Sequence, residues 1–185
     1  PVGEVKLTNA ELAEQTGAAA EVQSRTALLG ILALGEALAQ AGLTAADLPT
    51  TALVSGTTVG SMDVVERLYT VESEVPHLGD CAAVTEQTAR HFGHFGFVTT
   101  CSRPFDAHRA GLNLGEGAAF MVLESEAAAR RRGAHILAVL SGWGNACDAY
   151  HQTASSEDGE GAFLAMQQAL TTAGLAPTDI GYINA

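Results

Sequence analysis

The chain has 185 residues, enough for one domain or two small ones. Apolar residues make up 47% and charged residues 16%, so the chain can bury a core, which excludes disorder as its main state. Nine basic residues against 21 acidic ones give a net charge of −12, which argues against a nucleic-acid binder or a protein of anionic membrane surfaces. Three cysteines, the absence of a signal-peptide pattern and apolar runs too short to span a bilayer predict a cytoplasmic protein without disulfides.

Apolar periodicity and capping residues predict helices alternating with strands. Asn9 and Ser24 are the expected N-caps of the first two helices, and Gly42 and Gly174 are expected to end two buried ones. Such alternation is typical of an α/β domain with a covered sheet. In chain order, the expected elements are helices at 10–15 and 24–41, a strand at 51–55, helices at 62–71 and 85–92, strands at 96–100 and 118–123, a helix at 126–132, a strand at 135–142, a helix at 159–172 and a strand at 180–184.

An internal repeat accompanies these elements. Residues 41–48, Ala-Gly-Leu-Thr-Ala-Ala-Asp-Leu, are echoed by residues 173–180, Ala-Gly-Leu-Ala-Pro-Thr-Asp-Ile. The helices that precede them match in phase, since Leu34 corresponds to Met166 and Ile31 to Phe163. We therefore expect a duplicated unit in which both helices are buried. The alternative is chance recurrence of glycine caps and acidic turns.

Several motifs, taken together, resemble those of one enzyme family. They are Arg103-Pro104-Phe105-Asp106 followed by Gly115-Glu116-Gly117-Ala118, then Arg132-Gly133-Ala134, residues 148–154 and residues 181–185, with 24–34 and 55–60 in the first half. Their order and spacing resemble the β-ketoacyl-acyl-carrier-protein synthases, the elongating condensing enzymes of fatty acid and polyketide synthesis. The resemblance implies an α/β, thiolase-type layered fold with pseudo-duplicated halves, incomplete here. Residues 1–102 would come from the N-terminal half, and 103–185 would lead into the C-terminal half.

The resemblance also implies roles for four residues. Cys101, in Thr99-Thr100-Cys101-Ser102, takes the place of the nucleophile that accepts the acyl chain. Val59 takes the place of an aliphatic gate to the acyl pocket, and Thr153 lies in the loop beside the pantetheine channel. Glu116 would support the active site by hydrogen bonding. The alternatives are a buried structural thiol at Cys101, a core valine at Val59, and an alignment in which Cys101 belongs to the following motif and the nucleophile is lost.

The implied reaction is a decarboxylative Claisen condensation that needs no metal or redox cofactor. The implied partners are an acyl carrier protein and either an identical subunit or a chain-length factor. The family's two catalytic histidines have no counterpart in this sequence, so we expect the 185 residues alone to be inactive in condensation. Two rival functions are a non-catalytic subunit resembling a chain-length factor and a small α/β binding module. His91 and His94 are not expected to bind a metal, because Gly93 separates them and no further ligand completes a site.

Overall fold

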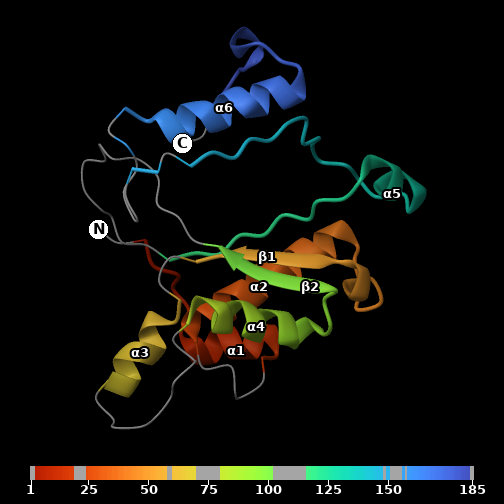
Figure 1. The fold of residues 1–185 in the computed structure, drawn as a ribbon. Helices are drawn as coiled ribbons and strands as arrows, with labels where there is room; N and C mark the ends of the chain where they lie inside the picture. The colour runs from red at the N-terminus through yellow and green to blue at the C-terminus, as the bar shows by residue number, and fades with distance from the viewer. Residues whose placement is uncertain are drawn as a thin grey trace. The chain divides into compact units, whose positions relative to one another are not determined.

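The computed structural model describes residues 3–18, 24–57, 60–69, 80–101, 116–147, 149–150, 156 and 158–183. The described residues fall into two compact units (Figure 1). The first is built from 3–101 together with 116–135, and the second from 136–183.

The first unit combines helices with a pair of parallel strands. Ala52 of β1 pairs with Phe97 of β2, and the register runs on to the pair Gly56 and Cys101. Parallel strands need a long crossover connection, and here the chain between them carries two helices. The elements are α1 (Asn9–Thr16), α2 (Arg25–Ala41), η1 (Leu48–Thr50), β1 (Ala52–Gly56), α3 (Met62–Tyr69), α4 (Cys81–Phe92), β2 (Phe97–Cys101) and α5 (Glu126–Arg131).

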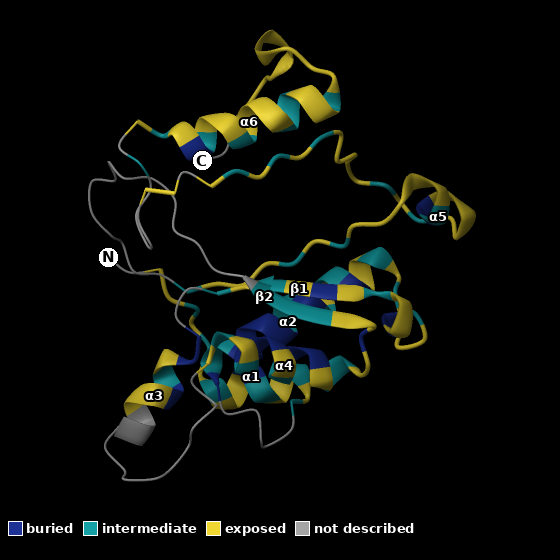
Figure 2. Ribbon diagram, in the orientation of Figure 1, coloured by how far each residue is buried: buried dark blue, intermediate teal, exposed yellow. Residues whose placement is uncertain are grey.

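The core of this unit lies between the strands and the helices beneath them. In Figure 1, β1 and β2 lie over α2 and α4, and Figure 2 shows α2 as the most buried element. Leu53 of β1 is buried, whereas Val54 beside it and Phe97 of β2 are exposed. Helices therefore cover one face of the strand pair within the described residues. The main cluster contains Leu34, Leu38, Leu48, Leu53, Ala89 and Phe95.

Capping residues set the limits of the helices, with one correction. Ser24 accepts a hydrogen bond from the backbone of Ala27 and Gly42 adopts a left-handed φ of 67°, so both predicted ends of α2 are confirmed. Asn9 was expected to cap α1, but the N-cap is Thr8, which forms a capping box with Glu11. The side chain of Asn9 instead accepts a hydrogen bond from Arg25.

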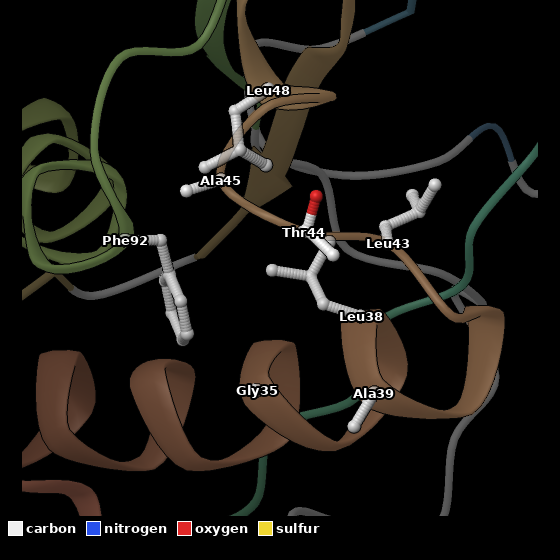
Figure 3. A pocket seen from close by; sticks show the side chains of 8 residues that line it. All are labelled: Gly35, Leu38, Ala39, Leu43, Thr44, Ala45, Leu48 and Phe92. Atoms are coloured by element: carbon white, nitrogen blue, oxygen red, sulfur yellow. The ribbon is translucent and has the colours of Figure 1, made fainter.

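A small apolar hollow lies at the C-terminal end of α2 (Figure 3). Its volume is about 280 Å³, and neither Cys101 nor Glu116 lines it. The lining residues are Gly35, Leu38, Ala39, Leu43, Thr44, Ala45, Leu48 and Phe92.

The second unit pairs one helix with an irregular segment. Residues 136–147 run beside α6 (Glu160–Ala173), which is followed by η2 (Pro177–Asp179). The backbone N–H of Trp143 donates to Thr172 Oγ1 at 3.0 Å, and that hydroxyl donates to the Trp143 carbonyl at 2.9 Å. A Cβ atom at Gly144 would lie 1.9 Å from the carbonyl oxygen of Ala165. The close approach of segment and helix therefore depends on a residue without a side chain.

Three predicted strands are absent from the described residues. Segments 118–123, 135–142 and 180–183 have no strand ladder there, although their apolar composition favoured strands. A strand requires a partner to hydrogen-bond, and the only ladder of two strands in the described part of the chain joins β1 and β2. Residue 184, the end of the last predicted strand, lies outside the described residues.

The burial expected for α6 is also wrong. Phe163 is 54% exposed and Met166 is 48% exposed, whereas the matching residues Ile31 and Leu34 in α2 are buried. Helix α2 packs against both α1 and α4, but in the described part of its own unit α6 has only the 136–147 segment beside it.

The two repeated segments nevertheless share their local geometry. The glycine that ends each helix is left-handed, with φ of 67° at Gly42 and 68° at Gly174. Two residues later a backbone N–H donates to an aspartate carboxylate, at 2.8 Å to Asp47 and at 2.9 Å to Asp179. The same cap and the same turn therefore follow α2 and α6.

Candidate functional site

The candidate nucleophile stands at the carboxyl end of β2. Cys101 is the last residue of this strand, and its backbone pairs with that of Gly56, the last residue of β1. The side chain of Cys101 lies outside the described atoms. One residue earlier, the Thr100 hydroxyl donates to Thr85 Oγ1 of α4 at 2.7 Å. The end of β2 is thus tied both to β1 and to the helix layer.

The first turn of α2 holds the chain that follows β1. The Ser61 hydroxyl donates to the Ser24 hydroxyl at 2.8 Å, and neither side chain has exposed surface. Beside this pair, the Thr26 hydroxyl donates to the carbonyl of Gly60 at 3.0 Å. These contacts fix residues 60–61 against the start of the main buried helix.

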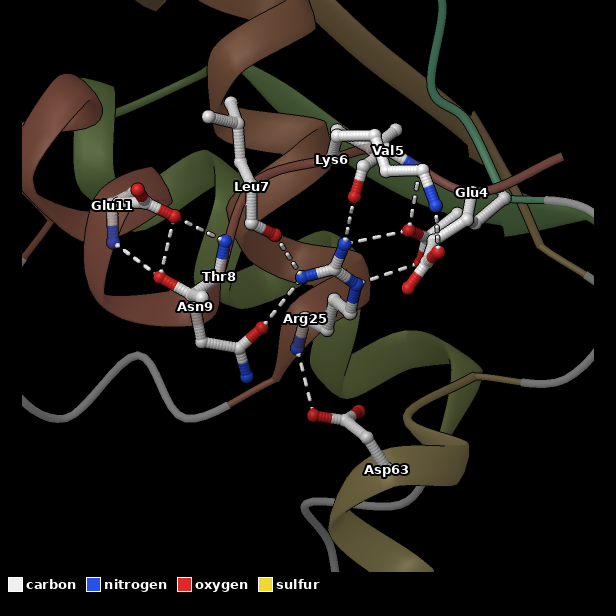
Figure 4. Close-up of polar contacts among 10 residues, drawn as sticks. Glu4, Val5, Lys6, Leu7, Thr8, Asn9, Glu11, Arg25 and Asp63 are labelled. Atoms are coloured by element: carbon white, nitrogen blue, oxygen red, sulfur yellow. Dashed lines mark hydrogen bonds and ion pairs between the residues drawn. The ribbon is translucent and has the colours of Figure 1, made fainter.

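An ion pair brings Glu116 to the same turn of α2 (Figure 4). Arg25 Nε donates to Glu116 Oε2 at 2.7 Å, and Nη2 donates to Oε1 at 2.6 Å. The backbone N–H of Val5 also donates to Oε1, at 2.9 Å. This two-point geometry is the strongest form of an arginine–carboxylate contact.

The remaining guanidinium donors of Arg25 bind the N-terminal segment. Nη1 donates to the carbonyl of Leu7 and to Asn9 Oδ1, and Nη2 donates to the carbonyl of Val5, each at 2.9 Å. All five guanidinium N–H groups therefore have an acceptor. The backbone N–H of Arg25 donates to Asp63 Oδ2 of α3 at 3.0 Å. One side chain thus joins the N-terminal segment, α2 and residue 116.

The ion pair keeps both groups charged. Hydrogen bonds from Arg25 lower the pKa of Glu116; burial opposes this shift, and the Val5 N–H adds a smaller lowering. The hydrogen bonds with Glu116 raise the pKa of Arg25. A carboxylate held this way is a weak general base, because protonating it would break the pair. Hydrogen bonding is the chemistry that this arrangement offers.

A second arginine lies at the other end of α2. Arg132 Nη1 donates to the carbonyl of Ala41 at 2.6 Å, and its Nε and Nη2 groups bind Glu124. The segment from Glu116 to Arg132 is therefore attached at both ends of the same helix. Glu116 meets its first residue, Arg25, and Arg132 meets its last residue, Ala41.

The described residues cover only part of the predicted site. Val59 and Thr153 lie outside them, Cys101 is described by its backbone, and Glu116 is described fully. Arg25 was not among the site residues predicted from the sequence. The signal was present, because Arg25 is the only charged residue in the first eleven positions of a mainly apolar helix. A cation at the start of such a helix requires a carboxylate nearby.

Neither a metal site nor a membrane span occurs in the part of the chain that the structure describes. No three His, Cys, Asp or Glu side chains come together there as metal ligands. None of the helices in the described ranges is both long enough and apolar enough to cross a bilayer. Cys81 and Cys147 are free thiols.

Comparison with known proteins identifies the family. The sequence model of the β-ketoacyl synthase C-terminal domain matches residues 137–185. The 3-oxoacyl-[acyl-carrier-protein] synthase 2 of Rhizobium meliloti (strain 1021) is 56% identical over 84 residues, which are 45% of this chain and 20% of that protein. Residues 137–185 belong to the β-ketoacyl synthase family, and the chain is similar to 3-oxoacyl-[acyl-carrier-protein] synthases.

Other relatives extend this match along the chain. The mitochondrial 3-oxoacyl-[acyl-carrier-protein] synthase of Arabidopsis thaliana is 52% identical over 84 residues, covering 45% of this chain and 18% of the relative. The 3-oxoacyl-[acyl-carrier-protein] synthase 2 of Staphylococcus aureus is 36% identical over 152 residues, covering 74% of this chain and 36% of the relative. The chain therefore spans about a fifth to a third of the length of the relatives that it matches.

Proposed function

We propose that the protein acts as a 3-oxoacyl-acyl-carrier-protein synthase, an acyltransferase that joins an acyl group to a malonyl unit with loss of CO2. The observation that carries this proposal is the identity of 56% to a relative named for that activity. The position of Cys101 at the end of a strand that pairs in parallel with β1 supports it.

In this function, Cys101 accepts the acyl chain. Its thiolate attacks the thioester carbonyl of acyl-carrier protein, a new thioester forms on the cysteine, and the carrier leaves as a thiolate that takes up a proton. The malonyl thioester then loses CO2, and the resulting carbanion equivalent displaces the acyl group from Cys101. Val59 would limit the acyl chain and Thr153 would bind the carrier's pantetheine arm. Glu116 would support the site through its ion pair with Arg25. The two-point geometry of that pair favours a role in holding residue 116 against the start of α2.

The fold proposed for this function is the thiolase type with pseudo-duplicated halves, of which 1–102 and 103–185 are parts. The shared cap and turn after α2 and α6 support the duplication. We also propose an acyl carrier protein as partner, a dimer as the assembly and the cytoplasm as the location. A heterodimer with a chain-length factor is the alternative assembly.

The test is acyl transfer to the chain itself. After incubation with acyl-carrier protein, the intact mass should rise by one acyl group, and peptide mapping should place that group on Cys101. Cys101→Ala should abolish the gain. Cys81→Ala and Cys147→Ala, which remove the two free thiols of the described residues, should retain it. An unmodified wild-type chain would contradict the proposal and favour a non-catalytic subunit.

A further inference from the structure

A buried hydroxyl pair ties α4 to the end of β2. Thr85 on α4 is 1% exposed, and its Oγ1 accepts the hydrogen bond from Thr100 at 2.7 Å. Thr100 directly precedes Cys101 and pairs with Ser55 in the ladder. The contact thus reaches the residue next to the proposed nucleophile from a different layer of the fold.

The helix that carries Thr85 is itself firmly placed. One turn further on, Thr88 is buried and its hydroxyl donates to the carbonyl of Val84 at 2.9 Å. A Cβ atom added at Gly30 of α2 would lie 3.0 Å from Thr88 Oγ1, so the two helices approach closely at this point. Helix α4 can therefore act as a fixed support for Thr100.

The strand needs such a support at this end. The ladder partner of Cys101 is Gly56, which has no side chain to pack against and weakens a strand. A hydrogen bond is short and directional, so the one between Thr85 and Thr100 constrains the backbone more tightly than apolar contact alone.

We propose that Thr85 is a positioning residue, whose hydroxyl holds Thr100 and thereby sets the backbone of Cys101 for acyl transfer. This inference rests on the proposed function, because it takes Cys101 as the nucleophile. Thr85 acts through Thr100 and contacts no reacting atom, and its effect is on the rate of the acylation step rather than on carrier binding.

The test compares three variants of the full chain. Thr85→Val keeps the shape and loses the hydroxyl, whereas Thr85→Ser keeps the hydroxyl. Thr88→Val removes an equally buried hydroxyl from the same helix but leaves β2 untouched. The rate of Cys101 acylation is measured by mass spectrometry against acyl-carrier protein concentration, with thermal unfolding of each variant alongside.

Thr85→Val should lower the maximal acylation rate about tenfold without changing the carrier concentration at half-maximal rate. Thr85→Ser and Thr88→Val should stay within about twofold of wild type, even where their melting temperatures fall. Equal rates in Thr85→Val and Thr88→Val, or no rescue in Thr85→Ser, would overturn the proposal.

Alkylation separates this inference from the proposed function. The rate of iodoacetamide modification at Cys101 is compared with that at Cys147, an exposed thiol of the second unit. If the wild-type chain is alkylated at Cys101 but never acylated, the proposed function is refuted. The role of Thr85 in acyl transfer is then refuted with it. If the Thr85 hydroxyl positions the backbone of Cys101, Thr85→Val should still change the ratio of the alkylation rates at Cys101 and Cys147. An unchanged ratio would remove the positioning role as well.

Discussion

At the scale of single residues, Arg25 is the side chain whose substitution we expect to destabilise the fold. Its five donors are all engaged and its side chain is 21% exposed. Arg25→Lys keeps the charge but replaces a planar fork with a point charge, which leaves buried acceptors unpaired. We expect the free energy of unfolding, measured in urea, to fall by about 1–3 kcal/mol.

The matched control for that change is Arg90→Lys. Arg90 forms an i,i+4 pair with Glu86 on the surface, where its side chain is 80% exposed. Exposed pairs contribute little, so this variant should remain within the error of the wild-type measurement. Equal losses in the two variants would mean that the Arg25 contacts add nothing beyond an ordinary surface pair.

The lowered pKa of Glu116 predicts how the ion pair responds to acid. A carboxyl whose pKa is lower in the folded than in the unfolded chain stabilises the fold above its unfolded pKa, about 4.3 for a glutamate. That stability declines as the pH falls through the folded pKa. Glu116→Gln should therefore unfold more easily than wild type at pH 7, and the difference should shrink steadily below about pH 4. A difference that persisted unchanged in acid would show that charge is not what Glu116 contributes.

At the scale of elements, the glycines of the 136–147 segment decide whether it can lie against α6. A methyl group at Gly144 would meet the carbonyl oxygen of Ala165, whereas one at Gly181 meets nothing within 4 Å. Gly144→Ala should thus detach the segment and expose the backbone N–H groups of Trp143 and Asn145 to exchange. Hydrogen exchange of these amides measures the effect, and Gly181→Ala should leave it unchanged. Unaltered protection in Gly144→Ala would show that the close approach is not required.

The elements that the sequence predicted well are those whose ends are set by capping residues close by in the chain. Ser24 and Gly42 mark both ends of α2, and Gly174 ends α6 as expected. The helix at 10–15 was correct in place, but its N-cap moved to Thr8, because Glu11 can complete a capping box only with that residue.

The errors concern partners distant in sequence. The 118–123 segment has the composition of a strand. Whether it forms one depends on a second segment that pairs with it, and its own sequence pattern does not reveal that partner. The exposure of Phe163 likewise depends on which layers cover α6. The pairing of Arg25 with Glu116 joins residues 91 positions apart, which no local rule connects.

At the scale of the whole molecule, two arginines attach the 116–132 segment to α2, one at each end of the helix. Arg25 uses a carboxylate on the segment, and Arg132 uses the final carbonyl of the helix. A cation near a helix C-terminus also interacts favourably with the helix dipole. The first unit is therefore held by polar contacts at its margins and by two apolar clusters in its interior.

The second unit exposes apolar surface that should dominate the behaviour of the 185-residue chain. Trp143, the only tryptophan in the sequence, is 64% exposed, and Leu137, Val139 and Leu140 are exposed beside it in the chain. Contiguous exposed apolar side chains favour association and dye binding. We expect the isolated chain to bind a hydrophobic dye such as ANS at neutral pH and to unfold with less than about 5 kcal/mol of stability.

Trp143 reports directly on this surface, and Leu137→Lys tests it. In dilute solution the indole should emit as a water-exposed group and be quenched freely by acrylamide, and a blue shift with rising concentration would mark association through this surface. Leu137→Lys replaces one exposed apolar group with a charge, so it should reduce both dye binding and the concentration-dependent shift without loss of helix content by circular dichroism. A Trp143 protected from quenching at the lowest concentration, together with a cooperative monomeric transition of ordinary stability, would mean that the surface is covered within a single chain.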